Sequence, residues 1–402
     1  MEAEQGKSGS AGEVFAAFAK LGVTAFGGPV AHLGYFRSEF VERRGWLDDR
    51  AYGEYVALAQ FLPGPASSQV GMALGAHRAG WLGGLAAWTA FTLPSALLMI
   101  AFAYGVVAMG DLSGAGWLAG LKLVAVAVVI QALWQMANSL CPDRPRAGLA
   151  LGGAALALLA PLLFGSAVLG QVGAILLGGL IGAAAFRREA PAAESGGLAV
   201  GRGAGAVLLS AFFALLLLVP PLAAAFADGP LAVFDSFYRA GALVFGGGHV
   251  VLPLLQAETV PTGWVDRDVF LAGYGAAQAL PGPLFTFAAY LGAAKEGAPS
   301  GVTGGLIALA AVFLPGALLI FGVLPFWRSL RRKPAMAGAV TGANAAVVGI
   351  LLAALYDPLW TATVAGAQDF AFLLAALALL MLVKTPPWAV VALGALAGWL
   401  LL

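Results

Sequence analysis

Charge is scarce in this sequence, and that scarcity excludes a soluble protein. Only 10% of the 402 residues are Asp, Glu, Lys or Arg, whereas 61% are hydrophobic, and the mean hydropathy is +0.90. A soluble domain with this composition would expose large apolar patches. The formal net charge of +1 provides no basic stripe of the kind that nucleic acid requires. We therefore expect a polytopic membrane protein in a lipid bilayer, with no nucleic-acid partner.

Cysteine and histidine are nearly absent as well. Cys141 is the one cysteine, which excludes an intrachain disulfide and a cysteine cluster for zinc or iron–sulfur binding. The three histidines, His32, His77 and His249, are scattered, and the Ser and Thr residues near them are isolated. We therefore expect no metal, no cofactor and no enzymatic activity. The first dozen residues lack the pattern of a cleaved signal peptide, so insertion through internal spans is expected.

What the sequence does contain is an internal duplication. Phe-Gly-Gly occurs at residues 26–28 and 245–247, and Ala-Gln-x-Leu-Pro-Gly-Pro follows at 59–65 and 277–283. The same breaks thus occur twice in the same order, which indicates two repeats. Further residues align around them: Phe15 with Phe234, Phe18 with Phe237, Lys20 with Arg239, Trp46 with Trp264, Asp48 with Asp266 and Pro94 with Pro315.

The apolar segments are of two lengths. About nine are candidates for full spans of the bilayer, which needs about 20 helical residues: 82–109, 117–140, 147–164, 167–186, 204–226, 302–326, 335–356 and the shorter 370–383 and 388–402. Glycine and proline interrupt the others, because neither continues a helix smoothly. These form four pairs of short segments: 14–26 with 30–41, 51–62 with 66–77, 233–245 with 250–260, and 269–280 with 284–294. We interpret each pair as a re-entrant helical hairpin with its tip near the middle of the bilayer.

The loop charges indicate that the repeats are inverted, because Lys and Arg in short loops mark the cytoplasmic face. The stretch 37–50 between the first two hairpins carries four arginines, whereas its counterpart 258–268 is mainly acidic. One span later the signs reverse, with bases at 328–333 and none in the matching loop. Single kinked crossings in place of hairpins also fit the hydropathy, but they would put the arginines of 37–50 outside. We predict an N-terminal repeat at 1–190, a linker with an extra transmembrane helix at 191–230, and an inverted C-terminal repeat at 231–402, with the N-terminus in the cytoplasm.

Inverted repeats with broken helices near the midplane are typical of secondary transporters. The helices that begin after the four breaks would direct free N–H groups and positive dipole ends to one place, which suits an anion. The residues predicted to bind substrate at these breaks are Gly27, Gly28, Pro63, Gly64, Gly246, Gly247, Gly248, Pro281 and Gly282.

Side chains near the breaks are candidates for the same site. Lys20 and Arg239 are matched cations at membrane depth, which are usually functional, although both could snorkel to the interface. Gln60 and Gln278 could donate to an oxyanion or bond to a neighbouring helix. The weaker candidates are Thr24, Ser67 and Thr286 as donors, and His32 and His249 either for proton coupling or as structural groups.

These motifs resemble the chromate ion transporter family in its long, two-domain bacterial form. The resemblance rests on the Phe-Gly-Gly motifs with His32 and His249 and on both Pro-Gly-Pro motifs, and it covers about 14–107 and 233–327. It implies chromate export across the bacterial inner membrane, and hence chromate resistance. Mechanistically, we expect alternating access by one repeat against the other.

Several alternatives stay open at this stage. The substrate could be sulfate or another oxyanion, moved by uptake or exchange, or the chain could be an anion channel with the same hairpins. The sequence also leaves open the coupling ion, whether there is one site or two, and the oligomeric state, a homodimer included.

Overall fold

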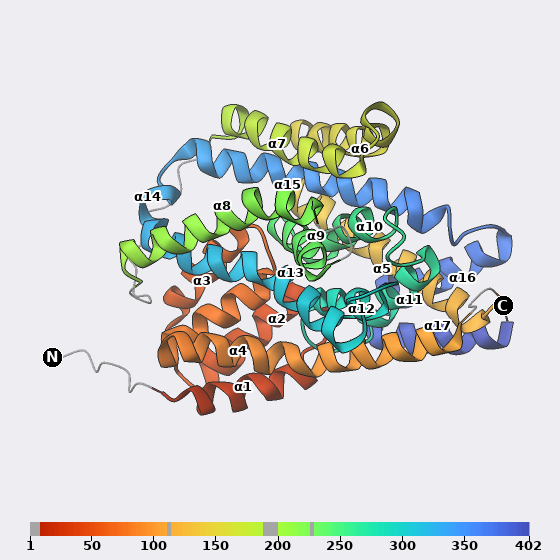
Figure 1. Cartoon of the computed structure of the whole chain (residues 1–402), viewed down its shortest axis with the longest axis horizontal. Helices are drawn as coiled ribbons and strands as arrows, with labels where there is room; N and C mark the ends of the chain where they lie inside the picture. Colours follow the sequence, from red (N-terminus) through yellow and green to blue (C-terminus); the bar gives the residue numbers. More distant parts are fainter. Residues whose placement is uncertain (1–8, 111–113, 188–199, 226–228, 402) are drawn as a thin grey trace.

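The computed structural model describes residues 9–110, 114–187, 200–225 and 229–401 (Figure 1). These residues form helices and connecting segments without a strand, which confirms the predicted all-α membrane fold. Part of the predicted linker at 191–230 lies outside the described residues. Its described part contains the extra apolar helix α8 (Arg202–Ala224), which is long enough to cross a membrane.

Helices end and begin at the four predicted breaks, and glycines with positive φ occupy each break. The helix pairs are α1 (Ala11–Thr24) with α2 (Gly28–Phe36), which continues as η1 (Arg37–Arg43); α3 (Asp49–Phe61) with α4 (Ala66–Met109); α9 (Pro230–Ala242) with η2 (Gly248–Val250) and α10 (Val251–Thr259); and α11 (Arg267–Ala277) with η3 (Leu284–Thr286) and α12 (Phe287–Ala294).

Contacts within the pairs show that the chain folds back at the breaks. The Trp46 indole donates to Glu13 at the start of α1 over 3.2 Å, while Phe18 in the middle of α1 stacks on Phe40 of η1 at 4.7 Å between ring centroids. In the last pair, the Tyr290 hydroxyl of α12 donates to the carbonyl of Val269 in α11 over 2.7 Å. These are antiparallel hairpins, as predicted, and not straight kinked helices.

The 44-residue helix α4 consists of two antiparallel arms. Ala79 and Gly80 have non-helical backbone angles, with φ of 64° at Gly80, and the chain reverses there. Gly75 and Gly83 face each other across the turn so closely that a Cβ on either would collide with the carbonyl of the other. The first arm completes the second hairpin and the other arm is a full span, in agreement with the predicted segments 66–77 and 82–109.

Seven helices are long and apolar enough to cross a membrane, so the expected number of about nine is wrong for the described residues. The seven are α4, α5 (Gly116–Leu140), α6 (Arg144–Phe164), α7 (Ala167–Ala185), α8, α13 (Gly301–Val323) with its extension to Phe326, and α15 (Pro334–Ala354) with its extension to Trp360. The terminal segments Ala367–Leu382 (α16 and η6) and Pro387–Leu401 (α17) are shorter. At about 1.5 Å per residue they fall short of a hydrocarbon core of about 30 Å.

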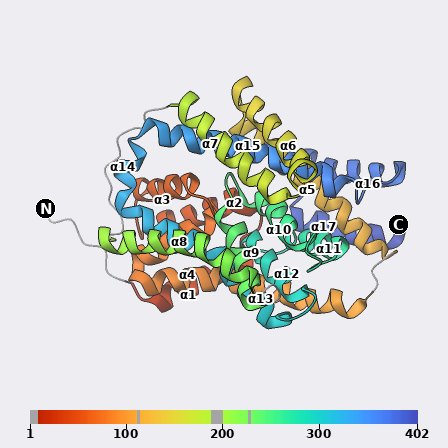
Figure 2. The same cartoon turned by 45° about the horizontal axis from the view of Figure 1, so that its top comes forward.

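The long helices of the two halves cross over. In both views α15 of the second half lies against α6 and α7 of the first, whereas α5 of the first half packs on α16 and α17 (Figures 1 and 2). Glycines make both contacts close: Gly178 of α7 packs against Gly342 of α15, and Gly120 of α5 packs against Gly394 of α17. Small residues allow such close approach where lipid provides no hydrophobic drive for association.

Candidate functional site

The breaks of the two halves meet at the centre of the molecule. The backbone N–H of Gly64 donates to the carbonyl of Val244 over 2.7 Å, and the N–H of Gly282 donates to the carbonyl of Ala25 over 2.9 Å. Gly64 corresponds to Gly282 in the duplication, and Ala25 corresponds to Val244. Each Pro-Gly-Pro tip is therefore bonded to the residue that precedes the Phe-Gly-Gly break of the other half.

Glycine is required at both tips. Gly64 has φ of 117° and Gly282 has φ of 93°, a region that residues with a Cβ rarely adopt. A Cβ on Gly64 would also lie 3.1 Å from Cα of Gly316, and one on Gly282 would lie 3.2 Å from the carbonyl oxygen of Phe91. Backbone conformation and close packing together explain the Pro-Gly-Pro motifs.

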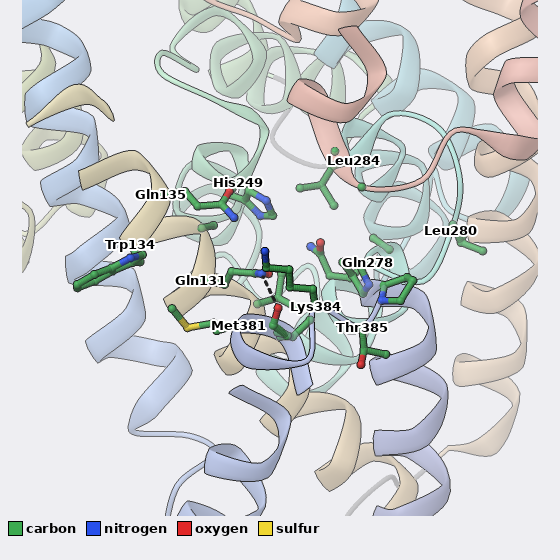
Figure 3. Close-up of a pocket in the computed structure, with 18 of the residues that line it drawn as sticks. Gln131, Trp134, Gln135, His249, Gln278, Leu280, Leu284, Met381, Lys384 and Thr385 are labelled. Carbon is green, nitrogen blue, oxygen red and sulfur yellow. Dashed lines mark hydrogen bonds between the residues drawn. The ribbon is translucent and has the colours of Figure 1, made fainter. Parts of the chain in front are cut away.

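A cavity of about 530 Å³ opens beside these tips (Figure 3). Three of the four breaks contribute to its wall, together with α5 and the loop between η6 (Ala378–Leu382) and α17. Its polar lining consists of backbone at Gly27, Gly28 and Gly282 and the side chains of Gln131, Trp134, Gln135, His249, Gln278, Lys384 and Thr385. Among the described residues that line it there is no Asp or Glu; the glutamine amides and the Thr385 hydroxyl can donate as well as accept hydrogen bonds, and Lys384 adds one positive charge.

The structure brings five of the sequence-predicted site residues into this cavity: Gly27, Gly28, His249, Gln278 and Gly282. The amide nitrogen of Gln278 is buried and makes no hydrogen bond of standard geometry with a described residue, although the side chain lies close enough to the Tyr274 hydroxyl to interact with it. A buried donor without a partner costs free energy. Gln278 is therefore a suitable donor for a ligand.

The two histidines near the breaks have different surroundings. His249 lies at the cavity wall, where its Nδ1 is 3.0 Å from the Tyr274 hydroxyl. His32 is 1% exposed; its Nε2 is 3.2 Å from the carbonyl oxygen of Ala25, and its Nδ1 is 3.4 Å from Ser67. His32 thus contacts the same carbonyl of Ala25 that accepts the hydrogen bond from the Gly282 N–H. It packs beside this contact between the two halves.

The two matched cations do not line the cavity. Arg239 forms a bidentate pair with Glu258, at 2.5 and 2.9 Å, and a further bond of 2.9 Å to Asp235. Lys20 is exposed on α1. Glu39, which corresponds to Glu258, binds Arg43 and Arg44 instead.

The other candidates also lie outside the cavity wall. Thr24 and Gln60 are exposed, and the Thr24 hydroxyl donates to the carbonyl of its own helix at Lys20. Thr286 is buried against Ser95, with 2.7 Å between the hydroxyls. The remaining predicted residues serve the packing of the tips: Pro63 accepts from Gln69, Gly248 lies beside Pro29, and Gly246 and Gly247 pack on α5. Ser67 faces His32, and Pro281 is half-buried beside the Gly282 tip.

Sequence reasoning missed part of the lining. Gln131 is a minor candidate from the sequence, whereas Gln135 was missed; the two lie four residues apart in a mainly apolar helix, a spacing that places them on one face. Lys384 and Thr385 follow the short segment that was taken for a full span. Their position at the cavity depends on the hairpin of α16 and α17, which hydropathy alone did not predict. In the described part of the chain, no three His, Cys, Asp or Glu side chains are grouped so as to hold a metal ion.

Comparison with known proteins gives a consistent picture. A family model described as "Chromate transporter" matches residues 12–227 and 231–399. The chain is 29% identical to the chromate transport protein of Pseudomonas aeruginosa over 358 residues, which covers 86% of this chain and 80% of that protein. It is also 29% identical over 343 residues to the chromate transport protein of Cupriavidus metallidurans, with coverage of 84% and 80%. An uncharacterised transporter of Bacillus subtilis, YwrA, is 34% identical over 122 residues, 30% of this chain and 66% of that protein. No solved structure matches the chain.

Proposed function

Because this multi-pass membrane protein belongs to the chromate transporter family, we propose that it exports chromate, a tetrahedral dianion, across the bacterial inner membrane. The observation that carries the proposal is the cavity at the crossing of the two halves. Broken helices from both halves surround it, it offers N–H and amide donors, and its described lining has no carboxylate. Donors in a protein-lined cavity can replace the hydration shell of an oxyanion, whereas carboxylates would repel it.

The proposed site contains fewer residues than the sequence suggested. It consists of the break residues that face the cavity together with His249, Gln278 and the two glutamines of α5. Arg239 is left out because two carboxylates already neutralise its charge, and Lys20 is left out because it is exposed outside the cavity. In this proposal both halves contribute to one shared site, and the chain does not form two equivalent sites.

Alternating access is the proposed mechanism, and the different surroundings of the matched breaks support it. A Cβ on Gly28 would meet no atom within 4 Å, whereas one on the matched Gly247 would lie 3.9 Å from Met136 of α5, and one on the neighbouring Gly246 would lie 3.3 Å from Leu140 of the same helix. Gly27 and Gly28 of the first Phe-Gly-Gly break thus line the cavity, whereas Gly246 and Gly247 of the second Phe-Gly-Gly break are covered by α5. In the proposed cycle, the Phe-Gly-Gly break of the C-terminal repeat (231–402) opens to the substrate while the Phe-Gly-Gly break of the N-terminal repeat (1–190) becomes covered. With the N-terminus in the cytoplasm, the interior-negative membrane potential would drive a dianion outward.

Flux measurements test the proposal directly. Everted membrane vesicles that contain the protein should accumulate radiolabelled chromate with saturable kinetics, and excess sulfate should slow this uptake. Vesicles without the protein, and vesicles with a collapsed membrane potential, are the controls. Transport of sulfate without chromate would retain an oxyanion carrier and reject chromate as its substrate. Flux that rises linearly with concentration would indicate a channel, and absence of any oxyanion flux would reject the proposal.

Thiol accessibility on α5 tests the two-state mechanism. In a Cys141→Ser background, Gln135→Cys should react rapidly with a membrane-impermeant thiol reagent from one side, because Gln135 is exposed at the cavity. Met136→Cys should react at least about tenfold more slowly, because Met136 is 9% exposed and covers the closed break.

Substrate should change these rates in opposite directions. Chromate turnover should accelerate the reaction of Met136→Cys, from the other side of the membrane, and should protect Gln135→Cys. If Met136→Cys reacts at the same rate with and without substrate, and from both sides, α5 does not close one of two alternating pathways.

A further inference from the structure

We infer that Lys384, at the tip of the C-terminal hairpin, is the positively charged group that binds the oxyanion in the central cavity. This inference rests on the proposed function and assigns the charge of its site to a residue outside both duplicated motifs. It also makes the short segments α16 and α17 part of the substrate site.

The first observation is the position of the hairpin tip. Residues 383–386 connect η6 to α17, and Lys384 and Thr385 line the cavity beside Gln131 and Gln278 (Figure 3). Gln131 also ties the end of η6 to α5, since its side-chain amide donates to the carbonyl of Leu380 over 3.3 Å. The hairpin is too short to be a pair of spans, but it is long enough to carry its tip to the substrate site.

The second observation is the charge of the lining. Lys384 is the one Asp, Glu, Lys or Arg among the described residues that line the cavity, and no salt bridge of the described chain includes it. A cation without a carboxylate partner complements an anionic ligand. Its ammonium carries three donors on a flexible stem, and it can therefore follow a tetrahedral oxyanion without demanding one orientation.

The third observation is the backbone of Lys384 itself. Its φ is 61°, and it is the one non-glycine residue with positive φ in the described chain. For an L-residue this conformation costs about 1 kcal/mol. Two backbone bonds hold the turn: the N–H of Val383 donates to the carbonyl of Ala378 over 3.0 Å, and the N–H of Thr385 donates to the carbonyl of Leu379 over 2.9 Å.

The duplication shows what this position looks like without a functional side chain. Gly165 lies at the tip between α6 and α7, the two helices that follow α5 in the first half as α16 and α17 follow α15 in the second. Its φ is 68°, so both tips use the same left-handed turn. Glycine, which adopts this conformation without strain, stands in the first half, whereas lysine stands where the tip meets the cavity. Strain retained at one of two equivalent positions indicates a role for the side chain.

Transport kinetics of Lys384→Gly test the inference. The substitution removes the charge and relieves the backbone, so the variant should fold at least as well as the wild type. Loss of a charged hydrogen bond to the substrate should raise the apparent KM for chromate about 10- to 100-fold in everted vesicles. Lys384→Arg should stay within about threefold of the wild type, and Lys333→Ala, which alters an exposed loop cation, should leave KM unchanged.

Chemical rescue separates charge from shape. In a Cys141→Ser background, Lys384→Cys should lose affinity, recover it when an ethylammonium thiosulfonate reagent adds a cation, and stay impaired when an ethylsulfonate reagent adds an anion. If Lys384→Gly keeps the wild-type KM, or if both reagents act alike, Lys384 does not bind the substrate, although the proposed function stands. If the wild type transports neither chromate nor sulfate, the proposed function and this inference are both rejected.

Discussion

Replacing Arg239 by alanine should lower the free energy of unfolding by about 3 kcal/mol, because it leaves two buried carboxylates without their shared cation. Glu258 and Asp235 are 8% and 5% exposed, and both bind the Arg239 guanidinium. Breaking a buried ion pair from one side costs far more than the pair itself contributes. The measurement is the thermal unfolding midpoint of the detergent-purified protein, together with the yield of folded protein in the membrane.

Lys20→Ala is the matched control, since Lys20 is the equivalent residue in the first half. It is exposed and should shift stability by no more than about 0.5 kcal/mol. An Arg239→Met variant combined with Glu258→Gln and Asp235→Asn should recover much of the lost stability, because it leaves no unpaired charge. If Arg239→Ala and Lys20→Ala are both stable and both lose transport, the two cations bind the anion after all, as the duplication alone suggested.

Replacing Gly342 by leucine should separate α15 from α7 and cost about 3 kcal/mol, the upper end for overpacking. A Cβ at Gly342 would collide with the carbonyl of Gly178 and lie 2.8 Å from Cα of Gly182. Backbone atoms of α7 cannot move aside as a flexible side chain would. Gly120→Leu in α5 should have a similar effect, because a Cβ there would collide with the carbonyl of Gly394. Thermal unfolding in detergent, with the fraction of monodisperse protein, measures both.

Gly152→Leu in α6 is the control for these variants. A Cβ at Gly152 would meet no atom within 4 Å, so leucine there should be tolerated, and its higher helix propensity offsets any loss. If Gly342→Leu and Gly120→Leu are as stable as Gly152→Leu, the halves do not pack through these glycines, and the crossed arrangement of the long helices is wrong.

Local sequence signals predicted the hairpins because breaks have local causes. Glycine adopts positive φ without strain, and proline cannot continue a helix. The sequence therefore shows where helices end at the four breaks, each of which contains a glycine with positive φ: Gly27, Gly64, Gly246 and Gly282. The duplication then located the same breaks in the second half. The number of full spans was overestimated because the helices of the C-terminal hairpin are as apolar as membrane-spanning helices. Only their shorter length distinguishes them from full spans.

The candidate site was predicted in part, and the reason is visible in Lys20 and Arg239. Their matched positions suggested a shared role, yet Arg239 meets Asp235 and Glu258 while Lys20 is exposed. Asp235 lies four residues before Arg239 in α9, but Glu258 comes from another helix, and Glu39, which could have matched Glu258, is bound to Arg43 and Arg44. Equal positions in a duplicated sequence therefore do not guarantee equal surroundings.

By itself, the sequence determined the membrane class, the two repeats and the four helix breaks, because hydropathy, periodicity and backbone preference act within a few residues of each position. Tertiary structure alone decided that Gly64 and Gly282 bond across the halves, that α16 and α17 form a hairpin, and that Lys384 lies in the cavity beside Gln278. These features join residues up to hundreds of positions apart, and their energies depend on close packing of helices that no local pattern specifies.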